Sequence, residues 1–305
     1  MASRADIIHS DNPMGMNPRE NRRSAPGRTV LRIVPICLVL GATLVAQPAD
    51  VNLVVTRVGN YVEQYYTRTR SLLVEETVIL QPFSRDWSFE GFARRLEYEL
   101  RVEWDPSNTE EPARVVRELV RASGPALGPP DQPDCMDPRT ISPEPLAFLL
   151  PDRRNAFSFE MAGSTRVDGR EAVMLDYRVV ARGEPTAEWT GHCAWVDLSG
   201  RMRGRVWVDA NTFEILRFDE HLVGLVDIPG PPDRSAFRPR SFTFERADTS
   251  IRYEHVTFEN PDETLMLPAR IENVTIIRNS GVPRLRTTQT YDNYRRFVTD
   301  SRIVP

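Results

Sequence analysis

The sequence contains no lysine, so all 39 of its basic residues are arginine. Lysine Schiff-base chemistry and lysine general-base catalysis are therefore excluded. Codon usage in a GC-rich genome explains this bias more simply than a phosphate-binding role for arginine does. The rest of the composition is ordinary for a globular protein, with 40% hydrophobic and 27% charged residues.

Short catalytic motifs are absent as well. No HExxH, GxSxG, GxGxxG or GxxxxGK pattern occurs in the chain. The neighbouring carboxylates Glu75-Glu76 and Asp219-Glu220 would point to opposite faces of a strand, so neither pair forms a catalytic dyad by itself. The sequence predicts no catalytic residue, no metal site and no cofactor. A secreted hydrolase whose carboxylates come from distant parts of the chain stays open.

Cysteine is scarce, with three residues in the chain. Cys37 falls in the N-terminal leader, so Cys135 and Cys193 are the two thiols expected in the exported protein. Two thiols in an oxidising compartment most simply form a disulfide. The alternative is a metal site of both cysteines with Asp137 and His192, but His192 and Cys193 are adjacent and would point to opposite sides of a strand.

Residues 1–46 have the pattern of an export signal. Six arginines accompany a largely apolar run at residues 33–46, which is shorter than the roughly 20 residues of a membrane-spanning helix. A cleaved signal is thus favoured over a retained anchor, and translation could begin at Met14 or Met16. We expect a periplasmic or secreted protein. Its remaining 33 arginines and 40 acidic residues argue against a nucleic-acid partner.

Residues 50–71 have the hydrophobic period of an amphipathic helix, with Asp50 as a suitable N-cap. The apolar side is formed by Val51, Val54, Val58, Tyr61 and Tyr65. Aromatic residues at helical spacing are more often core than a binding stripe. We therefore expect this side to pack against the rest of the domain.

Beyond residue 72 the period changes to two, which is typical of antiparallel strands with one buried face. The clearest strand is predicted at residues 94–104. Others are expected at residues 73–80, 115–122, 156–161, 172–181, 204–208, 213–223, 241–246, 251–258, 265–277 and 285–294. Prolines are dense at residues 123–145 and predict an extended insertion, followed by one helical turn at residues 146–150. No composition break divides residues 47–305, which are predicted to form one domain.

Residues 204–218 are the best-defined element and predict a β-hairpin. The expected register sets Val208 opposite Phe213 and Val206 opposite Ile215. These four side chains would share one face, and the other face would carry Arg205, Trp207, Glu214 and Leu216. A slip by one residue would exchange the faces.

The hairpin Arg205-Val206-Trp207-Val208-Asp209 … Thr212 … Ile215-Leu216-Arg217 is similar to the W-hydrophobic-D … T … hydrophobic-R hairpin of the periplasmic lipoprotein-carrier superfamily of half-barrels. The segments at residues 267–271 and 291–297 resemble closing strands of related bacterial envelope proteins, and the likeness extends over about residues 50–298. This resemblance implies an α+β fold, in which a curved antiparallel β half-barrel packs around an N-terminal amphipathic helix. In the carriers, the concave side accepts acyl chains of lipoproteins.

These observations favour a non-enzymatic exported protein that binds an apolar ligand, such as a lipid, or a lipidated protein partner in the cell envelope. The residues expected to line the site are Leu96, Tyr98, Leu100, Val102, Trp104, Val206, Val208, Phe213 and Ile215. Simple packing of a core under the helix explains the same residues without a ligand. The alternative function is an envelope protein-interaction or sensor domain, whose solvent-facing strands and Pro-rich loop contact another protein.

Overall fold

The computed structural model describes residues 50–69, 72–104, 113–128, 135, 137, 146–181, 183–190, 193–230, 241–259 and 261–296. All of them belong to one compact unit, Pro48–Pro305. The expected export signal at residues 1–46 lies outside the described residues, and so does His192. Within the described ranges no helix is long and apolar enough to cross a membrane.

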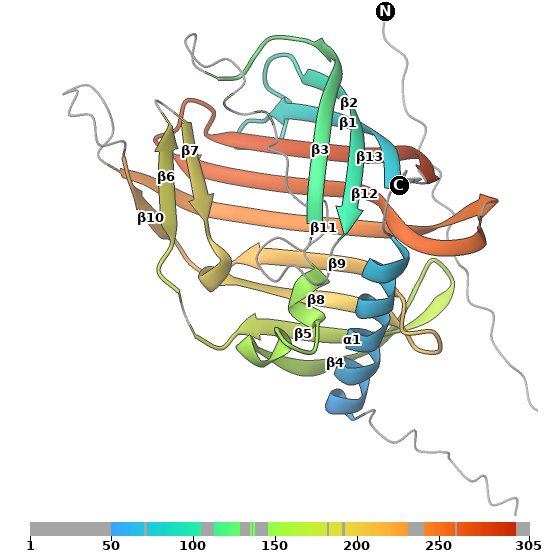
Figure 1. The fold of residues 1–305 in the computed structure, drawn as a ribbon. Helices are drawn as coiled ribbons and strands as arrows, with labels where there is room; N and C mark the ends of the chain where they lie inside the picture. The colour runs from blue at the N-terminus through green and yellow to red at the C-terminus, as the bar shows by residue number, and fades with distance from the viewer. Residues whose placement is uncertain are drawn as a thin grey trace, which may run out of the picture. The chain divides into compact units, whose positions relative to one another are not determined.

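An open antiparallel sheet of 11 strands carries a helix, α1, on one face (Figure 1). The strand order is β3-β2-β1-β13-β12-β11-β9-β8-β5-β4, and β10 pairs with β11 beside this path. The strands are β1 Leu72–Pro82, β2 Arg94–Trp104, β3 Ala113–Ser123, β4 Phe157–Val167, β5 Arg170–Val179, β8 Met202–Asp209, β9 Ile215–Leu222, β10 Val226–Pro229, β11 Ser241–Glu259, β12 Asp262–Arg278 and β13 Arg284–Arg296. A separate hairpin consists of β6 Thr186–Thr190 and β7 Cys193–Asp197, and the short 3-10 helices are η2 Leu146–Leu149, η3 Arg154–Ala156 and η4 Ser199–Arg201.

The predicted combination of one N-terminal helix with a long antiparallel sheet is confirmed. The sheet is not closed or strongly curled, however, because β3 and β4 are both edge strands and do not meet. The backbone of α1 approaches η2 and β4, at one end of the strand order. A helix at this position packs on part of one face of the sheet. The predicted half-barrel packed around the helix is therefore replaced by an open sheet with the helix on one face.

Helix α1 spans Val51–Arg68, close to the predicted range. Asp50 is its N-cap, and the Asp50 side chain accepts a hydrogen bond from the Asn52 amide at 3.0 Å. The buried side is formed by Val54, Val55, Val58, Gly59, Val62, Tyr65 and Tyr66. At Gly59 an added Cβ would lie 2.8 Å from the Leu149 carbonyl oxygen, so glycine allows η2 to approach α1 this closely.

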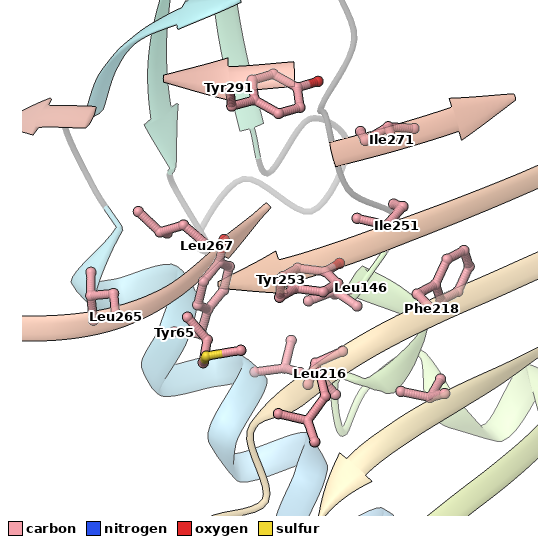
Figure 2. Close-up of a cluster of buried hydrophobic side chains, with 14 of the residues drawn as sticks. Tyr65, Leu146, Leu216, Phe218, Ile251, Tyr253, Leu265, Leu267, Ile271 and Tyr291 are labelled. Carbon is pink, nitrogen blue, oxygen red and sulfur yellow. The ribbon is translucent and has the colours of Figure 1, made fainter. Parts of the chain in front are cut away.

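We call the sheet face that packs against α1 the inner face and the opposite one the outer face. Figure 2 shows side chains of α1, η2, β9, β11 and β12 directed toward one another in the main hydrophobic core. A smaller core, formed by Val226, Ile228 and Phe244, packs against residues of the β6–β7 hairpin. No described helix or strand packs over the outer face of β4, β5, β8 and β9.

The predicted register of the 204–218 hairpin is wrong. Val208 lies opposite Ile215 and Val206 opposite Phe218, with a bulge between these pairs. The bulge brings both Ile215 and Leu216 into the core, although Leu216 was expected on the wet face. The cause is the turn, in which Asp209 pairs with Glu214 through a 2.9 Å backbone hydrogen bond, and Phe213 adopts a left-handed φ of 63°.

Candidate functional site

The residues predicted to line an apolar site belong mostly to the inner face. Seven of them are buried there: Leu96, Tyr98, Leu100, Val102, Val206, Val208 and Ile215. Phe213 is half-buried, and the side chain of Trp104 lies outside the described part of the chain. Leu96, Leu100 and Val206 each retain 0% of their accessible surface. Side chains that border a water-sized space would keep some surface, so these three are closely packed.

A buried ion pair interrupts this apolar face. Arg117 of β3 and Glu76 of β1 lie 2.7 Å apart, with side chains 5% and 0% exposed. Gln289 of β13 donates a second hydrogen bond to Glu76, at 2.8 Å. The Arg117 guanidinium also lies 4.8 Å from the ring centre of Tyr98. Glu76 is therefore held by residues from distant parts of the chain, and it has the surroundings of a structural rather than a catalytic carboxylate.

A half-buried carboxylate, Glu220 of β9, accepts a hydrogen bond from the Tyr177 hydroxyl at 2.6 Å. Burial raises the pKa of Glu220, although the bond from Tyr177 acts in the opposite direction. Burial also raises the pKa of Tyr177, and the charge of Glu220 adds to this effect. Gly204 makes room for the ring, because a Cβ at Gly204 would lie 2.6 Å from the Tyr177 side chain.

The Pro-rich insertion is fixed to the domain at two points. Cys135 and Cys193 form a disulfide, with Cα atoms 5.5 Å apart. Asp137 makes two hydrogen bonds to the guanidinium of Arg94, at 2.7 and 2.8 Å. Both cysteine sulfurs are thus bonded to each other, and Asp137 is bonded to Arg94. Three of the four ligands of the alternative metal site, Cys135, Cys193 and Asp137, therefore have other partners. Among the described residues, no three His, Cys, Asp or Glu side chains gather as metal ligands would.

The outer face has a groove of about 810 Å³, which we call the outer groove. Its outer-face lining is formed by Ser158, Glu160, Asp176, Arg178, Arg203, Arg205, Trp207, Asp219 and His221. Phe159, Tyr177 and Gly204 also border it, but Tyr177 packs on Phe148 in the main core of the inner face. The strand register explains why the outer-face residues meet, since Asp176 pairs with Arg205, and Arg205 with Asp219, across β5, β8 and β9. Residues directly opposite one another share a face, so the three side chains project together.

Trp207 is the aromatic centre of the outer groove. The guanidinium carbons of Arg217 and Arg205 lie 4.7 and 5.8 Å from its ring centre. Asp176 accepts a 2.9 Å hydrogen bond from Arg205, and Asp219 accepts one of the same length from Arg217. These carboxylates hold both cations beside the half-buried indole ring. The groove therefore presents a fixed aromatic surface with guanidinium groups on its flanks.

His221 also lines this groove. Arg203 donates a hydrogen bond from Nε to His221 Nε2 at 2.6 Å, which requires an unprotonated imidazole nitrogen. Burial lowers the pKa of His221, and the positive charge of Arg203 lowers it further. His221 is thus a neutral acceptor for arginine. The arrangement is suited to recognition by hydrogen bonds and stacking, and it brings no nucleophile to a general base.

None of the described residues that were predicted to bind a ligand lines the outer groove. The sequence analysis did place two groove residues, Arg205 and Trp207, together on the solvent-facing side of the hairpin. The parts of the groove come from four strands, and the contact of Trp207 with Arg217 depends on the bulge in β9. The similarity motif did contain a signal. Its Trp and Arg, here Trp207 and Arg217, contact each other on the outer face, where Trp207 lines the groove, and its Asp, here Asp209, closes the turn that follows β8.

No protein-family model matches the chain, and no curated protein matches it. Several solved structures are similar. A DUF1329 family protein from Desulfovibrio piger is 11% identical, with 82% of this chain and 95% of that chain covered and a TM-score of 0.40. A LolA superfamily protein from Nitrosomonas europaea is 10% identical, with 85% and 99% covered and a TM-score of 0.32.

A third similar structure is an outer membrane lipoprotein-sorting protein domain from Vibrio parahaemolyticus. It is 9% identical, with 80% of this chain and 94% of that chain covered and a TM-score of 0.31. The expected resemblance to the lipoprotein-carrier superfamily is thus confirmed as a structural similarity at low sequence identity. It concerns the fold, and no ligand or partner of this chain follows from it.

Proposed function

We propose that this chain is a non-enzymatic exported protein that recognises another protein of the cell envelope through the outer groove. The observation that carries this proposal is Trp207, which lies half-buried between Arg205 and Arg217 on a sheet face that no described helix or strand covers. Tryptophan and arginine are the residues most enriched among those that dominate the energy of protein interfaces.

The pairing of each arginine with a carboxylate supports the same function. Arg205 and Arg217 are held by Asp176 and Asp219, so less side-chain freedom is lost when a partner docks on them. Ser250 of β11 donates a 2.7 Å hydrogen bond to Asp219 and fixes it further. A surface that served only solubility would have no need of this second layer of contacts.

Site-specific photocrosslinking in living cells tests the proposal. A p-benzoylphenylalanine at Glu160, in the outer groove, is expected to form a covalent adduct with one envelope protein. Trp207→Ala in the same chain should abolish the adduct, since the indole is the proposed anchor. The same photoreactive residue at Arg95, which is exposed on β2, is the control and should give no adduct. Equal adducts from both positions, or an adduct indifferent to Trp207→Ala, would contradict the proposal.

Binding of an apolar ligand is the second candidate, and the extent of the inner apolar layer favours it. The main core contains buried side chains of α1, β2, β5 and β12, among other elements. The expected lining residues, such as Leu100 and Val206, would contact a ligand only if α1 moved away, because they are closely packed in this structure. Native mass spectrometry of protein from its own envelope fraction tests this. Ligand-free protein that takes up no fluorescent fatty acid would count against it.

A further inference from the structure

We propose that three arginines beside the outer groove bind the carboxylates of an acidic segment in the protein partner. Arg217 of β9, Arg252 of β11 and Arg270 of β12 lie directly opposite one another on adjacent strands. We call them the arginine row. Trp207 lies opposite Arg217, so the row continues from the proposed interface. The inference rests on the proposed function and specifies the chemistry of the partner.

The row is unfavourable for the isolated chain, because like charges directly opposite one another in a sheet repel. Its outer members are compensated within their own strands. Asp219 pairs with Arg217, and Glu272 accepts a 2.8 Å hydrogen bond from Arg270. The central residue, Arg252, is exposed and has no acidic partner among the described residues. An incoming carboxylate would supply the missing counter-charge.

Another part of the outer face offers an internal comparison. Glu75 and Glu99 lie directly opposite each other on β1 and β2, so they too are like charges in register. There the chain supplies its own counter-ion, since Arg295 lies 3.7 Å from Glu75 and 3.5 Å from Glu99. Arg252 has no such bridging residue in the described part of the chain. The difference points to a partner that comes from outside.

The surface around Arg252 has room for such a group. A pocket of about 290 Å³ is lined by Thr165, Arg166, Val167, Asp168, Trp207, Leu216, Arg217 and Arg252. Of its three arginines, Arg217 is paired with Asp219 and Arg166 lies 3.5 Å from Glu171, so Arg252 is the lining cation to which an anion would bind. Adjacent strands are about 4.8 Å apart, so the row extends over roughly 10 Å. This length is better suited to several carboxylates along an extended peptide than to one compact anion such as phosphate.

Isothermal titration of the full exported chain with two capped peptides tests the inference. The acidic probe is acetyl-(Glu-Ser)₄-amide, and the neutral control is acetyl-(Gln-Ser)₄-amide. We expect the acidic peptide to bind at low salt and the neutral peptide to bind at least about tenfold more weakly, because arginine–carboxylate hydrogen bonds are charge-assisted. Added salt should weaken the binding.

Two variants localise the effect. Arg252→Gln is expected to weaken binding of the acidic peptide by about tenfold or more. Arg95→Gln removes the same charge from an exposed residue on β2 and should leave the affinity unchanged. Equal binding of both peptides, or no effect of Arg252→Gln, would overturn the inference. The inference would also be overturned if Arg252→Gln weakened the binding of inorganic phosphate or of phosphatidylglycerol vesicles more than it weakened the binding of the acidic peptide.

The photocrosslinking experiment separates this inference from the function on which it rests. If the Glu160 adduct forms and depends on Trp207, but the acidic peptide does not bind, the outer groove keeps its function and the acidic partner is refuted. If neither the adduct nor peptide binding is seen, both proposals fail.

Discussion

Replacement of Arg117 by methionine would leave the carboxylate of Glu76 buried without its ion-pair partner. The Glu76 side chain is 0% exposed, so water cannot take the place of the guanidinium. Removal of one partner from a buried pair typically costs about 3–5 kcal/mol, because an uncompensated charge is left behind. The hydrogen bond from Gln289 stays in place but carries no full charge. We expect Arg117→Met to lose free energy of unfolding in this range.

Urea denaturation followed by circular dichroism measures the loss directly. For a domain of this size, 1 kcal/mol corresponds to about 2–4 °C in Tm, so the melting temperature should fall by roughly 6–20 °C. The double variant Glu76→Leu, Arg117→Met removes both charges, and the hydrogen-bonding groups that lose Glu76 as a partner, on Gln289 and Tyr291, are neutral. It should therefore be more stable than Arg117→Met alone.

An exposed ion pair on β2, the strand between β1 and β3, provides the control. Arg95 and Glu97 of β2 lie 2.9 Å apart, with side chains 48% and 32% exposed. Arg95→Met is expected to cost no more than about 1 kcal/mol. If Arg117→Met costs as little as this control, or if the double variant is less stable than Arg117→Met, then burial of Glu76 does not determine the strength of the pair and the reasoning is refuted.

Three further predictions concern the disulfide, the hairpin turn and the carboxylate of Glu220. Cys135→Ser, Cys193→Ser should lower the free energy of unfolding by about 4 kcal/mol in the chain-entropy description of a cross-link over 58 residues, and an unchanged denaturation midpoint would refute this. Asp209→Ala removes two amide hydrogen bonds of 2.8 Å and the pairing with Arg170, so it should cost more than Asp209→Asn, about 1–3 kcal/mol by denaturation. Burial raises the pKa of Glu220 above 4.5, so the stability that protonated Glu220 contributes is complete below this pH and is lost as the pH rises through the folded-state value. Wild type should thus lose stability relative to Glu220→Gln as the pH rises from 4.5 toward neutrality, and a constant difference over this range would contradict the effect of burial.

Local patterns in the sequence were sufficient where one face is continuously buried. The alternation at residues 94–104 predicts the bounds of β2 correctly, and the helical period predicts α1 to within a few residues. The pairing of Cys135 with Cys193 follows from the cysteine count once Cys37 is assigned to the expected leader. For β2 and α1 the signal lies in the segment itself, so distant residues are not needed to interpret it.

Other features depend on contacts that a linear pattern does not contain. Residues 241–246 and 251–258 belong to one strand, β11, because bulges opposite β12 absorb the breaks in alternation. The short strands β6 and β10 were not predicted, since segments of four or five residues give little periodic signal. The outer groove needs side chains from four strands in one register, and a single bulge in β9 determines which of them meet.

An open sheet has two ends at which another β-strand could add, and here they are β3 and β4. On β3, Val116, Leu119 and Val120 are about half or more exposed, which makes this margin prone to self-association. Glu118 and Arg121 are interspersed with them, and charged side chains of this kind discourage stacking of one molecule on the next. The solubility of the purified protein should therefore depend on these two charges, and their neutralisation should promote aggregation before any loss of the native fold.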